Sequence, residues 1–141
     1  MSPRVDFYVL ASGGDQERLR TACRVVEKAW QQGHAVWLTT DDERQAEQID
    51  QLLWTFRQNS FVPHERGTAG TIDDGAVHIV TLGSVPAGGV HVNVAAAALP
   101  LPLTGERVAE IIPADGPGRA AGRERFRAYR AQGYELTTHN I

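Results

Sequence analysis

The sequence predicts an α/β fold in which a mostly parallel sheet of about five strands carries helices on both faces, a Rossmann-like arrangement. The first support is segment 5–10, which is almost continuously apolar or aromatic, as expected of a strand buried on both faces. The second is the order of a strand-like segment, an amphipathic segment at 16–32 and another strand-like segment at 35–40. Such alternation is typical of parallel sheets. The other predicted strands are 77–81, 90–94 and 108–113.

The first helix is predicted from a break followed by helical periodicity. Gly13 and Gly14 end the first strand, and Asp15 is the expected helix cap. Gly33 is expected to end the helix, because glycine readily adopts the backbone conformation that closes helices. One apolar stripe at helical spacing is expected to face the sheet; its members are Leu19, Cys23, Val26 and Trp30.

A second helix is expected after the strand at 35–40. Asp41 or Asp42 would cap it, and acidic residues in its first turn suit the helix dipole. Strand, helix and strand in succession also imply a parallel pair joined by a right-handed crossover. The expected buried face consists of Ala46, Ile49, Leu52 and Leu53.

The remaining segments complete one predicted domain, residues 1–141. A loop is expected at 60–64 and a flexible turn at 67–75. Pro100 and Pro102 exclude a helix between the last two predicted strands. A linker at 114–118 leads to a final helix at 119–132, which Gly133 would end.

Composition narrows the functional classes. The 141 residues carry a net charge of −3, and no apolar run reaches the roughly 20 residues of a membrane helix. A single cysteine, Cys23, excludes a disulfide framework and a thiolate metal cluster. A soluble cytoplasmic protein without membrane contact is expected. The chain has one lysine, Lys28, and five of its arginines lie in 119–141 against two glutamates, a local charge of +3.

No catalytic motif is present. The turn at 11–15 lacks the glycine, lysine and hydroxyl pattern of a phosphate-binding loop, and Glu17 occupies the position of the third glycine of a dinucleotide fingerprint. No serine lies in a hydrolase elbow. Metal-ligand spacing is absent among the histidines, which are His34, His64, His78, His91 and His139. We therefore expect no catalytic residue, no metal and no cofactor.

An aromatic segment follows the second predicted helix. Trp54, Phe56 and Phe61 lie at and beyond the helix end. These side chains either close the helix onto the sheet or form an exposed apolar patch for a protein partner, because tryptophan and phenylalanine serve as interface anchors. The pattern alone favours the first interpretation.

The final helix carries a cationic stripe. At helical spacing, Arg119, Arg123 and Arg130 share a narrow sector, which Phe126 and Arg127 flank. Few acidic residues are near enough to pair with these guanidinium groups, and arginine forms bidentate bonds with carboxylate or phosphate. The pattern fits a pocket for an acidic peptide with an apolar end. A solvated cationic face and direct nucleic-acid binding by this helix are the alternatives.

Several segments together resemble the chi subunit family of the bacterial DNA polymerase III holoenzyme. The likeness covers nearly the whole chain in order, and no single segment decides it. The matching segments are 6–10, Ala22-Cys23 with 27–29, 33–36, 50–54, 60–64 and 123–133.

The resemblance implies a non-enzymatic adaptor of the clamp-loader complex, which meets DNA only indirectly. Members bind the acidic C-terminal tail of single-stranded DNA-binding protein, which ends in a Pro-Phe pair with a free carboxylate after aspartates. The family's tail pocket corresponds to Ile112, Arg123, Phe126 and Arg127. Members commonly have tyrosine at position 126 and lysine at position 127, so this chain loses a hydroxyl and keeps the charge.

The resemblance implies a second partner, the small psi subunit, which links chi to the clamp loader. The family's psi-facing surface corresponds to Trp54 and Phe61. A nucleotide-dependent enzyme on an α/β scaffold remains a third possibility, which rests on fold analogy alone.

Overall fold

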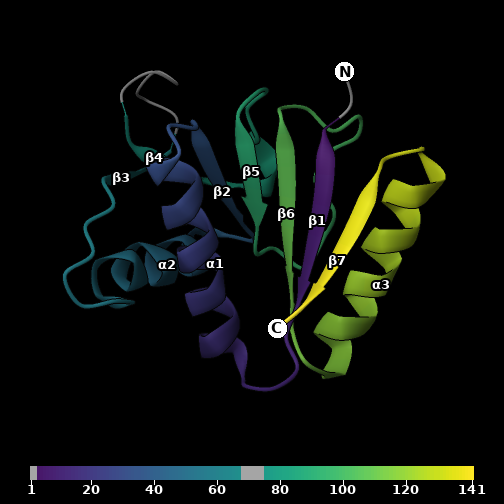
Figure 1. The fold of residues 1–141 in the computed structure, drawn as a ribbon, viewed down its shortest axis with the longest axis horizontal. Coiled ribbons are helices and arrows are strands. Elements are labelled where there is room, and N and C mark those ends of the chain that lie inside the picture. The colour runs from purple at the N-terminus through teal and green to yellow at the C-terminus, as the bar shows by residue number, and fades with distance from the viewer. Residues whose placement is uncertain (1–2, 68–74) are drawn as a thin grey trace.

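A computed structural model describes residues 3–67 and 75–141 and places its strands in one parallel sheet (Figure 1). Every strand pair in this sheet is parallel, and the strand order is β3-β4-β2-β5-β6-β1-β7. The strands are β1 (Arg4–Val9), β2 (Val36–Thr40), β3 (His64–Arg66), β4 (Val77–Thr81), β5 (Val90–Asn93), β6 (Arg107–Ile112) and β7 (Leu136–Asn140). The helices are α1 (Asp15–Gln31), α2 (Glu43–Thr55), α3 (Gly116–Ala131) and a 3₁₀ turn, η1 (Leu82–Ser84).

The α/β class is confirmed, but within residues 3–67 and 75–141 the sheet has seven strands where about five were predicted. Both unpredicted strands lie at the sheet edges. The expected loop at 60–64 ends at His64, which begins β3, and the strand at 108–113 was wrongly taken as the last, because β7 follows α3. Edge strands have few buried side chains, so their apolar signal is weak. The turn expected at 67–75 lies mostly outside the described residues.

The strands that flank α1 are not neighbours. β1 pairs with β6 and β7, whereas β2 pairs with β4 and β5. The prediction of an adjacent parallel pair was therefore wrong, although both strands belong to the same parallel sheet. The order places β5 and β6 between them, so segments late in the chain occupy the centre of the sheet.

The observed helix boundaries agree with the sequence prediction except at the starts of α1 and α3. Asp42 caps α2, because its Oδ1 accepts the N–H of Gln45 at 2.9 Å. Asp15 does not cap α1; Gly14 is the cap residue and Asp15 is the first helical residue. α3 begins at Gly116, inside the expected linker, with a proline in its first turn where a missing N–H costs nothing.

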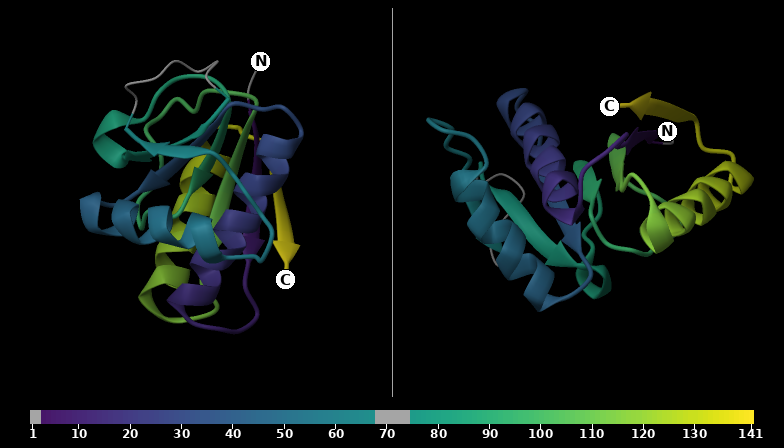
Figure 2. Two further views of the ribbon diagram at one scale, coloured as in Figure 1. Left: turned by 90° about the vertical axis from the view of Figure 1, so that its left-hand side faces the viewer. Right: turned by 90° about the horizontal axis from the view of Figure 1, so that it is seen from below.

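Two cores lie on opposite faces of the sheet. One core joins α1 and α2 to the sheet, and the other lies under α3 and the segment that carries Leu99 and Leu103. The view from below in Figure 2 shows α1 and α3 on opposite sides of β6 and β1. Helices on both faces were predicted, and this part of the prediction is confirmed. None of the described helices is long and apolar enough to cross a bilayer.

A buried polar network around Glu110 of β6 fixes α3 to the sheet. Arg125 of α3 donates from Nε to the Glu110 carboxylate at 2.9 Å, and the Tyr129 hydroxyl donates to it at 2.6 Å. Asn93 of β5 donates from its amide at 3.0 Å. Burial raises the pKa of the Glu110 carboxyl, and the charge of Arg125 together with these hydrogen bonds opposes that shift.

The same network holds the segment that follows β5. Arg125 donates to the carbonyl of Ala96 at 2.7 Å, and the Tyr129 hydroxyl accepts the N–H of Leu99 at 3.0 Å. Asn93 donates to the carbonyl of Ala97 at 3.0 Å. Backbone groups of a segment outside the strands are therefore satisfied by side chains from α3 and β5, which fixes the position of α3 along the sheet.

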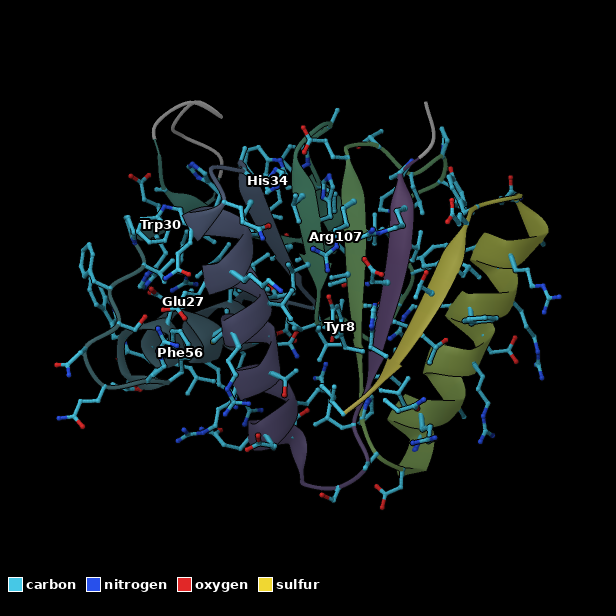
Figure 3. All side chains as sticks on the ribbon, in the orientation of Figure 1. Tyr8, Glu27, Trp30, His34, Phe56 and Arg107 are labelled. Carbon is cyan, nitrogen blue, oxygen red and sulfur yellow. The ribbon has the colours of Figure 1, made fainter. Side chains whose placement is uncertain are left out.

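A second polar cluster lies on the opposite face of β1, centred on the buried carboxylate of Asp6. Arg107 donates to it from Nε at 2.7 Å, His139 of β7 lies 2.9 Å away, and Arg4 lies 3.3 Å away. The ring of Tyr8 stacks on His139 with centroids 4.8 Å apart, and its hydroxyl accepts a bond from Arg107. Figure 3 shows Tyr8 and Arg107 together on the face between α1 and β7. This cluster ties edge strand β7 to β1 and β6.

We predict that Arg125→Met lowers the free energy of unfolding by about 3 kcal/mol, because the buried Glu110 carboxylate loses its charged partner. Urea denaturation measures the change. Arg127→Met is the matched control on the same helix; because Arg127 is exposed, this change should cost less than about 0.5 kcal/mol. Equal losses for the two variants would show that the buried pair contributes no more than a surface one.

We predict a loss of stability in acid that depends on Asp6. Burial raises the pKa of Asp6, but the bonds from His139 and Arg107 and the charges of Arg107 and Arg4 outweigh burial and hold the pKa below its ordinary value. The stabilisation is therefore complete above the ordinary pKa and is lost as the pH falls through the lowered value.

Urea denaturation between pH 5 and pH 2 checks this expectation. Asp6→Asn should lower the free energy of unfolding by about 1–3 kcal/mol near pH 5, because the cationic neighbours lose a charged acceptor. Its stability should then fall less steeply in acid than that of the parent chain. Parallel curves for the two proteins would contradict the role assigned to Asp6.

Candidate functional site

A small groove lies between the middle of α3 and the sheet. It encloses about 120 Å³ and lies over the carboxyl-terminal halves of β1, β6 and β7. Its lining residues are Phe7, Val9, Ile112, Arg119, Gly122, Arg123, Phe126 and Thr138. The groove therefore joins one helix to three adjacent strands, which are far apart in the sequence.

The floor of the groove is apolar. Ile112 is buried, and the ring of Phe126 meets the ring of Phe7 edge to face with centroids 5.2 Å apart. Gly122 faces Ile112, and a Cβ atom at position 122 would lie 2.8 Å from the Cγ2 atom of Ile112. A larger residue would therefore force Ile112 to move, and glycine allows α3 to lie close to the sheet here. The result is a shallow slot for one apolar side chain.

Two guanidinium groups line this slot. Arg119 is half-buried, and its Nη1 donates to the carbonyls of Ala114 at 2.7 Å and Leu10 at 3.5 Å, which orients the side chain. Arg123 is exposed, and within the described residues it has no hydrogen bond or ion pair. An oriented cation and an unpaired cation beside an apolar slot suit a ligand that has a carboxylate next to an apolar group.

The structure brings together three of the four residues expected at a tail pocket. Ile112, Arg123 and Phe126 all line the groove. Arg127 does not line it; its side chain is 72% exposed and donates to Glu124 at 2.7 Å. The cause is helical phase, because Arg127 projects away from the sheet on the far side of Arg123.

The sequence reasoning missed Thr138, Gly122 and the place of Arg119 in the lining. Thr138 belongs to β7, which was not predicted as a strand, so nothing pointed to it. Arg119 had a signal, because it lay on the predicted cationic stripe. Among the guanidinium groups of the final helix, Arg127 pairs with Glu124, an acidic residue that the sequence places nearby. Arg125 is buried against Glu110 of β6, a partner that the helical pattern could not reveal.

A second surface lies at the other end of the sheet, where Trp54 of α2 and Phe61 form an aromatic patch. Their side chains are 53% and 62% exposed, and their ring centroids lie 5.8 Å apart. His64 lies beneath Trp54 with centroids 4.6 Å apart. Both ring nitrogens of His64 are bonded, one to the carbonyl of Val62 at 2.7 Å and one to Asp50 at 2.8 Å. A fixed histidine thus supports the exposed indole.

The loop before Phe61 is tied to α1 through Glu27. Arg57 lies 3.1 Å from its carboxylate, and the Ser60 hydroxyl donates to it. Phe56 is buried in the core that α2 forms with the sheet, and Figure 3 labels it in the region of Glu27. Phe56 therefore closes α2 onto the sheet, whereas the exposure of Trp54 and Phe61 favours the interpretation of a patch for a protein partner.

The described residues show little that suggests catalysis. A cavity of about 280 Å³ lies at the carboxyl ends of β5 and β6, where Arg18 and Arg125 already bond to backbone carbonyls. Burial raises the pKa of the Cys23 thiol to about 12, so the reactive thiolate is suppressed. In the described part of the chain, no cluster of three histidine, cysteine or acidic side chains could hold a metal ion.

Comparison with known proteins finds relatives that match nearly the whole chain. The family model described as "DNA polymerase III chi subunit, HolC" matches residues 1–137. The DNA polymerase III subunit chi of Pseudomonas aeruginosa is 39% identical over 98% of this chain and 96% of its own. Those of Haemophilus influenzae and Escherichia coli are each 26% identical, and they cover 100% and 94% of this chain and 99% and 94% of their own.

Structural comparison adds a likeness of fold. A crystal structure of T4 UvsW superposes with a TM-score of 0.63 at 10% sequence identity. The match covers 99% of this chain and 41% of that chain. At this identity the likeness shows a shared α/β architecture and carries no functional argument.

Proposed function

The chain belongs to the family of DNA polymerase III chi subunits, which are replication accessory proteins, and we propose that it is a non-catalytic adaptor in the cytoplasm. Its role is to connect the clamp-loader complex to single-stranded DNA-binding protein by holding the acidic C-terminal tail of that protein. One observation carries the proposal: the unpaired guanidinium of Arg123 lies beside an apolar slot of about one side chain's size.

The groove suits a terminal phenylalanine with a free carboxylate. The ring enters the slot between Ile112 and Phe126, while the carboxylate meets Arg123 and Arg119. Arg119 is already oriented by backbone carbonyls, so little side-chain freedom is lost when it binds. Charge-assisted bonds from guanidinium to carboxylate are stronger than neutral ones, which gives the terminal position its specificity.

The exposed aromatic patch supports a second partner, the psi subunit. Trp54 and Phe61 are held by His64 and by the loop tied to Glu27, so their rings are presented in fixed positions. Rigid aromatic anchors are typical of interface hot spots. The patch lies near edge strand β3 and the groove near edge strand β7, so the two partners would bind at opposite ends of the sheet.

Direct binding of nucleic acid by α3 is the alternative function, and the structure gives it less support. Within the described residues, Arg123 and Arg130 are the members of the cationic stripe that make no hydrogen bond or ion pair. Phosphate-backbone binding draws its affinity from many cations together, and the net charge of −3 opposes it.

We predict that Arg123→Ala weakens binding of an acidic peptide ending in Pro-Phe by about tenfold or more, because a charge-assisted bond contributes about 1.5–3 kcal/mol. Arg127→Ala should lower the peptide affinity less, because Arg127 lies outside the groove lining and already pairs with Glu124. Isothermal titration calorimetry measures the affinities, and Arg44→Ala, an exposed change on α2, is the control.

Binding should weaken as salt is added, because Arg123 and Arg127 are exposed and their attraction for the peptide is screened. An absence of binding heat with the parent chain, or an affinity indifferent to Arg123, would refute the tail-binding function. Tight binding of a labelled single-stranded oligonucleotide in fluorescence anisotropy would instead support the alternative.

We predict that changing Trp54 and Phe61 together to alanine abolishes the complex with a psi subunit and leaves peptide affinity unchanged. The two sites share no residue, and the exposed rings can be removed at a cost of about 1 kcal/mol in stability. Size-exclusion chromatography with the psi subunit and calorimetry with the peptide check the two halves. Loss of peptide binding in this variant would contradict the division into two sites.

A further inference from the structure

The two edges of the sheet differ in how they are protected. Edge strand β3 has three residues, and its Arg66 pairs with Glu43 at 2.6 Å. Edge strand β7 has five residues, Leu-Thr-Thr-His-Asn, with no acidic residue, lysine, arginine or proline. Short length, charge and proline are the usual means of preventing an edge from pairing with another chain. β7 has none of them, so its outer edge is open to an added strand.

The register shows which backbone groups of β7 point outward. The carbonyl of Glu135 accepts the N–H of Val5, and Ile141 donates its N–H to Val9 and accepts from Ala11. These odd-numbered residues bond toward β1, and backbone groups in a strand alternate in direction from one residue to the next. The N–H and C=O groups of Leu136, Thr138 and Asn140 therefore point away from β1, toward the open edge.

The open edge is continuous with the groove. Thr138 has an outward-pointing backbone, and its side chain lines the groove with Phe126 and Arg123. Figure 1 shows β7 running beside α3 along the helix's length. A ligand anchored in the groove therefore has an unpaired strand edge beside it.

We propose that the acidic peptide held in the groove continues along β7 as an eighth, parallel strand. This inference rests on the proposed tail-binding function and specifies how the residues before the terminal aromatic residue are held. Thr138 supplies main-chain hydrogen bonds to the peptide, and Leu136 supplies the next pair. This is recognition by strand addition, in which main-chain bonds give affinity and a side-chain pocket gives specificity.

The charges along α3 set the direction of the peptide. Asp115 lies at the amino end of the helix, whereas Arg123, Arg127 and Arg130 follow toward its carboxyl end and outnumber the two glutamates there, Glu124 and Glu135. With the terminal carboxylate at Arg123, the preceding aspartates are repelled by Asp115 and attracted toward Arg130.

A short connection joins the end of α3 to the start of β7, so Arg130 lies at the Leu136 end of the strand. The peptide thus runs from the Leu136 end toward the Asn140 end, in the same direction as β7. An added strand of this direction continues the all-parallel pairing of the sheet.

Scanning the peptide with N-methyl groups tests the pairing on the unmodified protein. The probe is a ten-residue peptide of aspartate and glycine ending in Pro-Phe with a free carboxylate, methylated at one amide at a time. Strand pairing makes every second amide a donor to β7, so affinity should fall about three- to tenfold at alternate positions and change little between them. Equal effects at all positions would overturn the proposal.

Substitutions at position 136 provide the matched test on the protein, because Leu136 has an outward-pointing backbone and does not line the groove. Leu136→Pro removes the outward N–H at the first residue of β7, a place in a strand that tolerates proline, and Leu136→Val keeps the N–H. We expect Leu136→Pro to weaken binding of the ten-residue peptide about three- to tenfold and to leave NMR-detected binding of the Pro-Phe dipeptide unchanged. Leu136→Val should bind both peptides as the parent chain does.

The outcomes separate this inference from the function on which it rests. If the parent chain does not bind the ten-residue peptide, the tail-binding function fails. If it binds but the methyl scan shows no alternation, the function stands and the added strand is refuted. If Leu136→Pro weakens binding of both peptides equally, the effect belongs to the groove and counts against the added strand. Analytical ultracentrifugation provides a further check. A dimer that pairs through β7 and does not dissociate when the peptide is added also overturns the proposal.

Discussion

The buried pair of Glu110 and Arg125 is the constraint on which the groove depends. A carboxylate in the centre of a sheet is costly unless its acceptors are filled, and here Arg125, Tyr129 and Asn93 fill them. These bonds allow one position of α3 along the sheet, because moving the helix by a turn would leave the carboxylate without its charged partner. The position that satisfies Glu110 also places Gly122 against Ile112 and opens the groove one turn earlier along the helix.

The polar groups on the two faces of β1 and β6 therefore have different structural roles. On the α3 face, Glu110 fixes a helix; on the α1 face, Asp6 gathers Arg107 and His139 and holds edge strand β7 in register. Without β7 the groove would lose Thr138, one of its walls. The site is therefore apolar where a ligand ring would lie but is positioned by ion pairs that the ligand does not touch.

Each pattern in the sequence could predict only the structural features that produce it. Hydrophobic periodicity located the three helices and the central strands, because buried side chains dominate those segments. β7 was not predicted, because the sequence of an edge strand with one apolar residue, Leu136, resembles that of a polar tail. The arginine stripe was visible, yet periodicity could not reveal that Arg125 pairs with Glu110, since that contact depends on tertiary structure. Ile112, Arg123 and Phe126 were assigned through family resemblance, whereas Thr138 required the sheet order.

Placing the two surfaces at opposite ends of one sheet has a mechanical consequence. The groove is built on β1, β6, β7 and α3, while the aromatic patch is built on α2 and the loop before β3, and a parallel sheet with hydrogen bonds across every strand connects them. Such a sheet has few soft degrees of freedom, so a partner at one end does not need to alter the other. Under the proposed function, simultaneous binding then follows from geometry, and coupling between the two partners would require a change in the Glu110 network that positions α3.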